Sequence, residues 1–587
     1  MSCGTQATGE GVYLTFGRVL NPPKGFHIIT MNYLKKIILT LCLLTCCLFS
    51  AIAQNYLVVN GKIENLTIKL YRQSDVIKIS RVNLLRGREE ITTTATLQAD
   101  GSFKASIPLI FPLEECVLSY GNVVSAPFLA QKGELSITIL ADSLGKAEVP
   151  FRFEGLNAKT NNRHALFEVA LAKYMKTRKD YDDYFKKLAR KTATSGWEFA
   201  QGFRDFRLVY YNYFQNNQPT DKLLDKWVNL SLTEATKGNY FEHLYYLNEK
   251  PLATLTDSLK IDTSAFMTFS KADLASQYYR HTFSTLKTNI NSLKVEQIAE
   301  IVLKYAKSLT ENERNRLETI FKTKEAQNKD LRFLNDVFTR NNTELQLIST
   351  YELLIRQLGF VLNTKDLDLM IALIWAQTTK DLTLANSNKV YQHIRPKIEN
   401  RLYIKSLDEL HRLENIDSLT IEKLKDKSFV SQNDGRFGSH LIEALPKIYL
   451  YKNEYQTGRQ ILDNLKKEYR GQKLYLIYWK ISDDNCTDNL KESVFLRNFL
   501  SESDIQFVYI CNSKAEEQLW KETVIKNKLK GIHILGANEA QDDYFEDEFT
   551  KLAPPPYAAI VTEKGKTVQA PLPTDHEGWD KLLKTWK

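Results

Sequence analysis

The chain has 587 residues, of which 43% are hydrophobic and 25% are charged. This length is too great for a single hydrophobic core, so several domains are expected. The 79 basic and 70 acidic side chains give a mild net charge of +9. The basic residues are spread among acidic ones without a dense tract, which argues against a surface that binds nucleic acid.

Residues 31–53 have the three parts of a secretory signal peptide. A short basic segment at 31–36 is followed by an apolar run at 37–51, and small residues precede Gln54 as a cleavage site. The apolar run is shorter than the roughly 20 residues that a membrane-spanning helix requires. We therefore expect the leader to be removed and the protein to be exported to the periplasm or to a membrane surface of the cell envelope.

Residues 1–30 have none of these features and would displace the basic segment from the terminus, so Met31 is interpreted as the true start and 1–30 as a mis-assigned upstream extension. A membrane anchor that is never cleaved remains an alternative. A lipid anchor on Cys46 or Cys47 is a further one, although the residues before them fit the lipoprotein pattern poorly. The cysteines beyond the leader are Cys116, Cys486 and Cys511. Three are too few for a disulfide-framed scaffold, so packed cores must supply the stability.

Short β-prone runs bounded by Gly, Asn, Asp and Pro occupy residues 54–161. The clearest of these runs are 56–63, 67–71, 100–105 and 134–140. They predict a small antiparallel β domain, built as a β-sandwich.

Residues 162–440 are predicted to form an all-α helical domain. No proline occurs between Pro251 and Pro396, as is typical of packed helices that cannot lose a backbone N–H. Apolar residues repeat every 3.6 positions over 347–358 and again over 367–375, which predicts one buried face on each helix. The Thr-Glu-Asn-Glu sequence at 310–313 predicts a capping box at another helix start.

Candidate ligand-binding residues in the helical region are few. An aromatic-rich stretch at 197–246 could line a ligand groove, but helical core is the favoured interpretation. Candidate metal ligands in the region include His243, His281, His393 and His411. They are isolated and lack the spacing of zinc ligands, so no metal and no cofactor is predicted.

Residues 441–587 are predicted to form an α/β domain. Six apolar and aromatic residues at 474–479 and further apolar runs at 507–511, 531–535 and 557–561 indicate buried strands. Charged stretches at 513–530 and 576–586 indicate helices, and a Glu-Lys-Gly-Lys turn at 563–566 indicates a final hairpin.

This order resembles the exported thioredoxin-like proteins of the thiol-disulfide interchange (TlpA-like) family, in which a β domain and a helical insert also precede the thioredoxin-like domain. In that family the first active-site cysteine stands four residues after the tryptophan that ends the strand, and the second stands seven residues after it. Counted from Trp479, these positions are Asp483 and Cys486. The resemblance also implies a cis-proline before the third strand, at Pro556.

A carboxylate at Asp483 cannot replace the thiolate that attacks a substrate disulfide. The leading hypothesis is therefore a redox-inactive, non-enzymatic module that binds a protein or peptide partner in the cell envelope. One alternative is a thiol-disulfide oxidoreductase that uses Cys486 alone. The other is a structural scaffold that binds through its helical region. Cys486 and Cys511 are expected to be free, shielded thiols, because Cys486 lies beyond its strand and out of disulfide range.

Overall fold

The computed structural model describes residues 55–74, 76–121, 123–177, 192–216, 221–285, 293–325, 327–340, 342–425, 441–445, 447–451, 453, 455–483, 486–487, 490, 505–549, 556–570, 572–573 and 581–582. The predicted upstream extension and leader, with Cys46 and Cys47, lie outside this part of the chain. Within it, no helix combines the length and the apolar character that crossing a membrane requires.

Two packed sheets form from the first strands of the chain. The strands are β1 (Asn55–Glu64), β2 (Val76–Asn83), β3 (Arg86–Thr96), β4 (Ser102–Leu109), β5 (Leu113–Tyr120), β6 (Val124–Ala130), β7 (Gly133–Leu140) and β8 (Phe151–Gly155). One sheet has the order β4-β1-β7-β8 and the other has β3-β2-β5-β6. Alternate residues of β4 and β5 are buried, as the two-residue period of a strand with one inward face requires. These inward faces share one apolar core.

Two details of this region differ from the predicted antiparallel sandwich. β1 pairs with β7 in parallel. The long connection that a parallel pair requires contains β2, β3, β5 and β6, which form the other sheet. Residues 67–71 were expected to be a strand, yet Ile68–Gln73 form helix α2. The hydroxyl of Thr67 accepts the backbone N–H of Leu70, so a capping interaction prevails over the β-prone composition of this short segment.

A helical middle follows, with many helices. They are α3 (Ala158–Thr177), α5 (Ala193–Asn216), α6 (Lys222–Leu247), α7 (Phe269–Thr285), α8 (Val295–Tyr305), α9 (Glu311–Thr323), α10 (Asn328–Arg340), α11 (Asn342–Gly359), α12 (Thr364–Thr378), α13 (Leu384–Ile394), α14 (Arg401–Glu414) and α15 (Ser418–Lys425). The region is not wholly α-helical, since β9 (Phe266–Met267) pairs in parallel with β5 of the sandwich. Short 3₁₀ turns occur at Ala141–Ser143, Ala253–Leu255, Thr379–Asp381 and Arg395–Lys397.

The capping box and the buried stripe of α11 are confirmed, whereas the single buried face expected for α12 is wrong. Thr310 and Glu313 form the predicted capping box, each side chain accepting the other residue's backbone N–H at 3.3 and 2.9 Å. In α11, Ile348, Tyr351 and Leu358 of the predicted stripe are buried. In α12, however, every residue from 368 to 376 is buried, because this helix lies inside the largest core of the helical middle rather than at its edge.

The C-terminal sheet contains seven strands. They are β10 (Leu441–Leu445), β11 (Ile448–Tyr451), β12 (Lys473–Trp479), β13 (Ile505–Cys511), β14 (Gly531–Leu535), β15 (Tyr557–Val561) and β16 (Thr567–Gln569), in the order β10-β11-β14-β13-β12-β15-β16. Strands β11, β14, β13 and β12 are parallel to one another, whereas β10 is antiparallel to β11 and β15 is antiparallel to β12. A hairpin joins β15 to β16, as the turn at 563–566 predicts.

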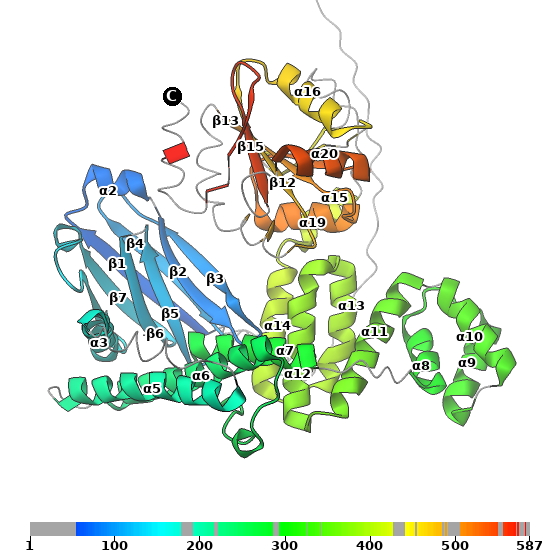
Figure 1. The fold of residues 1–587 in the computed structure, drawn as a ribbon, viewed down its shortest axis with the longest axis horizontal. Coiled ribbons are helices and arrows are strands. Elements are labelled where there is room, and N and C mark those ends of the chain that lie inside the picture. The colour runs from blue at the N-terminus through cyan, green and yellow to red at the C-terminus, as the bar shows by residue number, and fades with distance from the viewer. Residues whose placement is uncertain are drawn as a thin grey trace, which may run out of the picture. The chain divides into compact units, whose positions relative to one another are not determined.

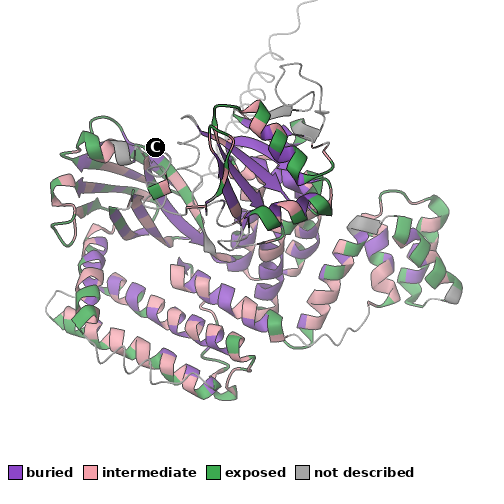
Figure 2. Cartoon of the chain, turned by 45° about the horizontal axis from the view of Figure 1, so that its top comes forward, coloured by how far each residue is buried: buried purple, intermediate pink, exposed green. Residues whose placement is uncertain are grey.

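Helices cover both faces of this sheet. One face packs against α16 (Gly458–Glu468) and α20 (Glu539–Phe549), and the other packs against α19 (Glu517–Asn527). These elements are labelled in Figure 1, and Figure 2 shows the central strands as buried. Both faces of β12 are buried, which explains its unbroken apolar sequence. Of the helix predicted at 576–586, only residues 581–582 are described, and they are helical.

Candidate functional site

The candidate site lies at one edge of the C-terminal sheet. Trp479 ends β12 and pairs with Cys511 at the end of the parallel strand β13. Tyr557 begins the antiparallel strand β15 and pairs with Tyr478, so Pro556 belongs to this same edge. The carboxyl ends of parallel strands in open α/β sheets are where ligands gather. The fold thus brings the segment after Trp479 and the residue before β15 together.

Asp483 caps the helical turn that follows β12. The backbone N–H of Thr487 donates to the Asp483 carbonyl oxygen at 3.1 Å, which is the first hydrogen bond of the turn. The backbone N–H of Cys486 donates to the Asp483 side-chain oxygen Oδ1 at 3.3 Å. A carboxylate at this position satisfies a backbone donor that has no partner inside the helix. Asp483 therefore has a structural function where the resemblance implies a nucleophile.

Cys486 is helical and has no solvent-exposed surface. Burial raises the pKa of its thiol to about 12. A hydrogen bond to the Lys480 backbone opposes this effect, the nearby Asp483 carboxylate adds to it, and the charge of Lys480 opposes it least. A helix N-terminus ordinarily favours a thiolate, but burial outweighs this effect here. Cys486 is therefore a neutral thiol at physiological pH.

Cys511 lies in the same core at the end of β13. Its sulfur donates to the Asn512 side-chain oxygen at 3.7 Å, and burial raises the pKa of the thiol well above its usual value. Cys486 and Cys511 form no disulfide, and both are buried as free thiols, as the spacing predicted.

Asn512 fixes the position of the segment after β12. Its backbone N–H donates to the Trp479 carbonyl at 3.1 Å, and its side-chain oxygen accepts the backbone N–H of Ile481 at 3.4 Å. This residue was not identified from the sequence, because an Asn after a strand is an ordinary turn residue.

Lys480 is the basic residue beside Cys486. Its Nζ lies 2.8 Å from Oε1 of Glu546 on α20, and this contact raises the pKa of Lys480. The Tyr478 hydroxyl also donates to Glu546, at 3.5 Å. Lys480 is the cation that could stabilise a thiolate at Cys486, but its ammonium group pairs with the Glu546 carboxylate instead.

Pro556 is buried immediately before β15. Residues 551–555, which precede it, are outside the described part of the chain, so Pro556 is placed by the register of β15 alone.

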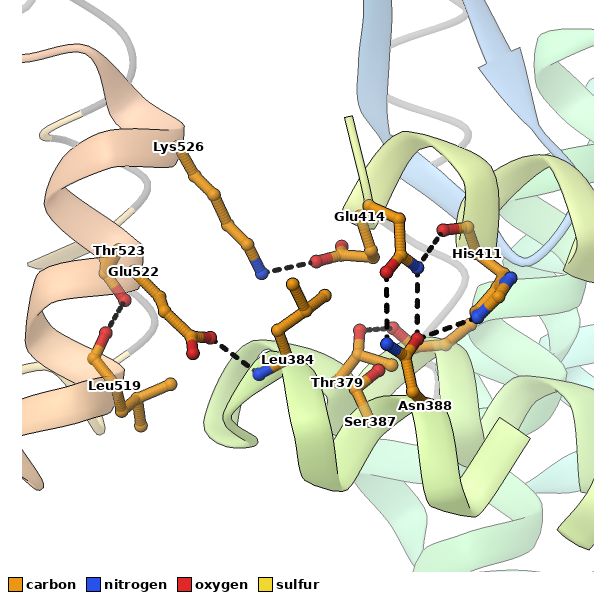
Figure 3. A network of polar contacts seen from close by, with 12 residues as sticks. Thr379, Leu384, Ser387, Asn388, His411, Glu414, Leu519, Glu522, Thr523 and Lys526 are labelled. Atoms are coloured by element: carbon orange, nitrogen blue, oxygen red, sulfur yellow. Dashed lines mark hydrogen bonds and ion pairs between the residues drawn. The ribbon is translucent and has the colours of Figure 1, made fainter. Parts of the chain in front are cut away.

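A polar network that the sequence did not reveal joins α19 to the helical middle (Figure 3). The Glu522 carboxylate accepts the backbone N–H of Leu384, the first residue of α13, at 2.6 Å. Lys526 and Arg86 both contact the Glu414 carboxylate, at 2.7 and 2.8 Å. The partners lie more than 100 positions apart along the chain, and no local pattern marks them. The contacts fix α19 against the ends of α13 and α14.

The four isolated histidines have individual partners. The His243 and His281 rings bond the carbonyls of Thr192 and Glu249, His393 contacts Glu352, and His411 contacts Asn388. Among the described residues, no group of three or more His, Cys, Asp or Glu side chains could hold a metal ion.

The aromatic-rich stretch divides between core and surface. Trp227, Tyr240 and Phe241 are buried, whereas Tyr213 and Tyr246 are largely exposed. The stretch is thus mainly helical core, although Phe241 also lines a cavity.

Comparisons with known proteins give partial matches to solved structures. No family model matches the sequence, and no curated protein matches it significantly. The thioredoxin domain of a thiol-disulfide oxidoreductase from Bacteroides vulgatus is 15% identical over 21% of this chain and 84% of its own, with a TM-score of 0.18. The thiol:disulfide interchange protein of Chlorobium tepidum is 11% identical over 20% of this chain and 83% of its own, with a TM-score of 0.18. These solved neighbours are thioredoxin-like proteins that match about a fifth of the chain.

Proposed function

We propose that this protein is an exported thioredoxin-like binding protein that does not turn over disulfides. The observation that carries the proposal is the geometry of Asp483, which caps the helix start from the position where the family has its nucleophile. The export part rests on the order of basic, apolar and small residues at 31–53.

The single-cysteine alternative requires Cys486 to attack an external disulfide as a thiolate. Burial raises the pKa of this thiol to about 12, so the thiolate is disfavoured at neutral pH. The side chain is also fully buried, so a substrate sulfur has no approach to it. Both properties oppose the catalytic alternative.

The proposed partner is a protein or peptide of the cell envelope, bound at the edge formed by the ends of β12 and β13 and the start of β15. In the family that the chain resembles, the proline loop before this strand holds an extended substrate by backbone hydrogen bonds, which need no thiol. Ser482 is exposed in the turn between Trp479 and Asp483 and marks the accessible part of this edge.

The scaffold alternative gains support from one observation. The contacts of Glu522 and Lys526 with α13 and α14 hold the C-terminal domain to the helical middle. In this alternative the helical middle binds the partner, and the C-terminal domain is a fixed cap.

Two experiments test the proposal. Insulin reduction with dithiothreitol as electron donor should stay at background for the wild type and for Cys486→Ser, and activity that Cys486→Ser abolishes would favour the oxidoreductase. Affinity capture from the cell envelope should lose its partner in Ser482→Trp. The matched control is Lys564→Trp, in the exposed turn at the opposite end of β15. Capture that Ser482→Trp leaves intact would instead favour the scaffold.

A further inference from the structure

A cavity of about 820 Å³ lies within the helical middle, far along the sequence from the edge that carries Asp483. Its walls come from α6, α7, α12 and α14, from the segment at 250–263, and from the loop between α11 and α12. Binding sites for small molecules typically enclose about 300–1,000 Å³. The cavity is therefore large enough for a ligand rather than a few water molecules.

The inner wall of the cavity is mainly apolar and aromatic, with His281 and Thr282 as buried polar members. Phe241 and Tyr278 pack edge to face with ring centroids 5.2 Å apart, and Leu259 and Leu369 are buried beside them. Tyr403 adds a third ring from α14. Such a wall suits an apolar body and discriminates against a highly charged one.

The mouth of the cavity carries a surplus of positive charge. Lys250, Lys260 and Lys365 line it and are exposed, while Asp366 is the one carboxylate among the lining residues. Lys260 also pairs with Asp257, at 2.7 Å. Lys250 and Lys365 form no ion pair with any of the described residues. Two lysines are thus available to an acidic group at the entrance.

An apolar lip adjoins this charged mouth. Phe360 and Val361, in the loop after α11, are 66% and 70% exposed. Large apolar side chains that are left in water beside a cavity mark a surface that a ligand can cover. The lip extends the apolar surface from the interior to the entrance.

We propose that this cavity binds a small amphiphile with one acidic group, whose apolar body lies against Phe241 and Tyr278 and whose carboxylate lies between Lys250 and Lys365. The arrangement of the wall decides the ligand class. Aromatic and aliphatic surface lies within, and Lys250 and Lys365 at the rim have no ion pair among the described residues. The cavity and the proposed partner edge are formed by different residues, so each proposal can be tested without the other.

The test uses the full chain and three ten-carbon probes that differ only in their head groups: decanoate, decanol and decyltrimethylammonium. Each probe, below its micelle concentration, displaces the fluorescent anion 1-anilinonaphthalene-8-sulfonate. Decanoate should displace it most strongly and the quaternary ammonium least. The double variant Lys250→Glu, Lys365→Glu should weaken decanoate binding at least about tenfold, since attraction becomes repulsion at both positions.

The controls separate this site from general surface charge. Lys104→Glu with Lys146→Glu reverses two exposed lysines of the β domain and should leave decanoate binding unchanged. Val361→Asp, at a largely exposed position, should weaken binding by adding a negative charge to the lip. Equal affinity for the three head groups, no displacement at all, or equal weakening by the two lysine pairs would each overturn the proposal. Ser482→Trp should have no effect here, which distinguishes a failure of this site from a failure of the partner edge.

Discussion

The backbone N–H of Cys486 points at the carboxylate of Asp483 across 3.3 Å. In an active thiol-disulfide site, two cysteines with this spacing react with the substrate disulfide and form a disulfide between themselves. Here the pair makes a helix cap, in which one residue contributes a side-chain acceptor and the other only its backbone. The same arrangement shields the sulfur of Cys486 in the core and places a negative charge beside it.

Replacing Asp483 should therefore change stability rather than catalysis. Asp483→Ala removes the acceptor for the Cys486 N–H, and we expect the free energy of unfolding to fall by about 1 kcal/mol. Asp483→Asn keeps an acceptor oxygen and should be close to the wild type. Urea unfolding monitored by fluorescence measures both. An alanine variant as stable as the asparagine variant would mean that the cap contributes nothing.

The three described cysteines should resist modification in the folded protein. Cys116, Cys486 and Cys511 are all buried, and burial raises the pKa of each thiol. We expect slow labelling by a maleimide at pH 7 and rapid labelling of all three in denaturant. Cys486→Ser should reduce the denatured count by one and leave the native rate unchanged. Rapid native labelling that this substitution abolishes would show an accessible Cys486.

Strands β12 to β15 of the C-terminal sheet could be predicted because both of their faces are buried, whereas β10 and β11 were not predicted. The run at 474–479 becomes β12, and those at 507–511, 531–535 and 557–561 become β13, β14 and β15. Short continuous apolar runs bounded by turn residues are typical of such strands. The pattern indicates which residues are buried but not which strand is the partner, so the parallel pairing of β1 with β7 could not be foreseen.

The candidate site was only partly visible in the sequence. The spacing after Trp479 singled out Asp483 and Cys486, but the pKa of Cys486 depends on opposing effects, and the extent of burial that decides between them is set by packing. Asn512 and Glu414 were missed for a related reason. Their partners come from other elements, and only the folded chain brings them together.

Gly531, at the start of β14, should not tolerate a side chain. Its φ is +139°, and a Cβ atom there would lie 2.6 Å from the carbonyl oxygen of Phe507. We expect Gly531→Ala to lower the free energy of unfolding by about 1–3 kcal/mol, through backbone strain together with the clash. Gly471→Ala is the matched control, because Gly471 also has a positive φ but no atom lies within 4 Å of its Cβ position. Equal losses in the two variants would exclude a contribution from the clash.

Glu414 should make the stability of the protein sensitive to acid. Burial alone would raise the pKa of this carboxyl, but Arg86 and Lys526 outweigh it and hold the pKa at about 2. Because the folded-state pKa lies below the ordinary value of 4.5, the ionised group stabilises the folded state above pH 4.5. This contribution, on the order of 3 kcal/mol, should disappear as the pH falls from about 4.5 to about 2.

Glu414→Gln isolates this effect from the other carboxyl groups. At pH 7 the variant should unfold at a clearly lower urea concentration, because Arg86 and Lys526 lose their shared anion. The difference in the free energy of unfolding between the variant and the wild type should narrow as the pH falls toward 3. Below pH 4.5 the ionised Glu414 carboxyl contributes less to the stability of the wild type. Glu318→Gln is the control: its exposed pair with Lys322 should contribute less than about 1 kcal/mol at any pH. If the difference between Glu414→Gln and the wild type stayed constant from pH 7 to pH 3, charge at Glu414 could not be what holds α14, α19 and β3 together.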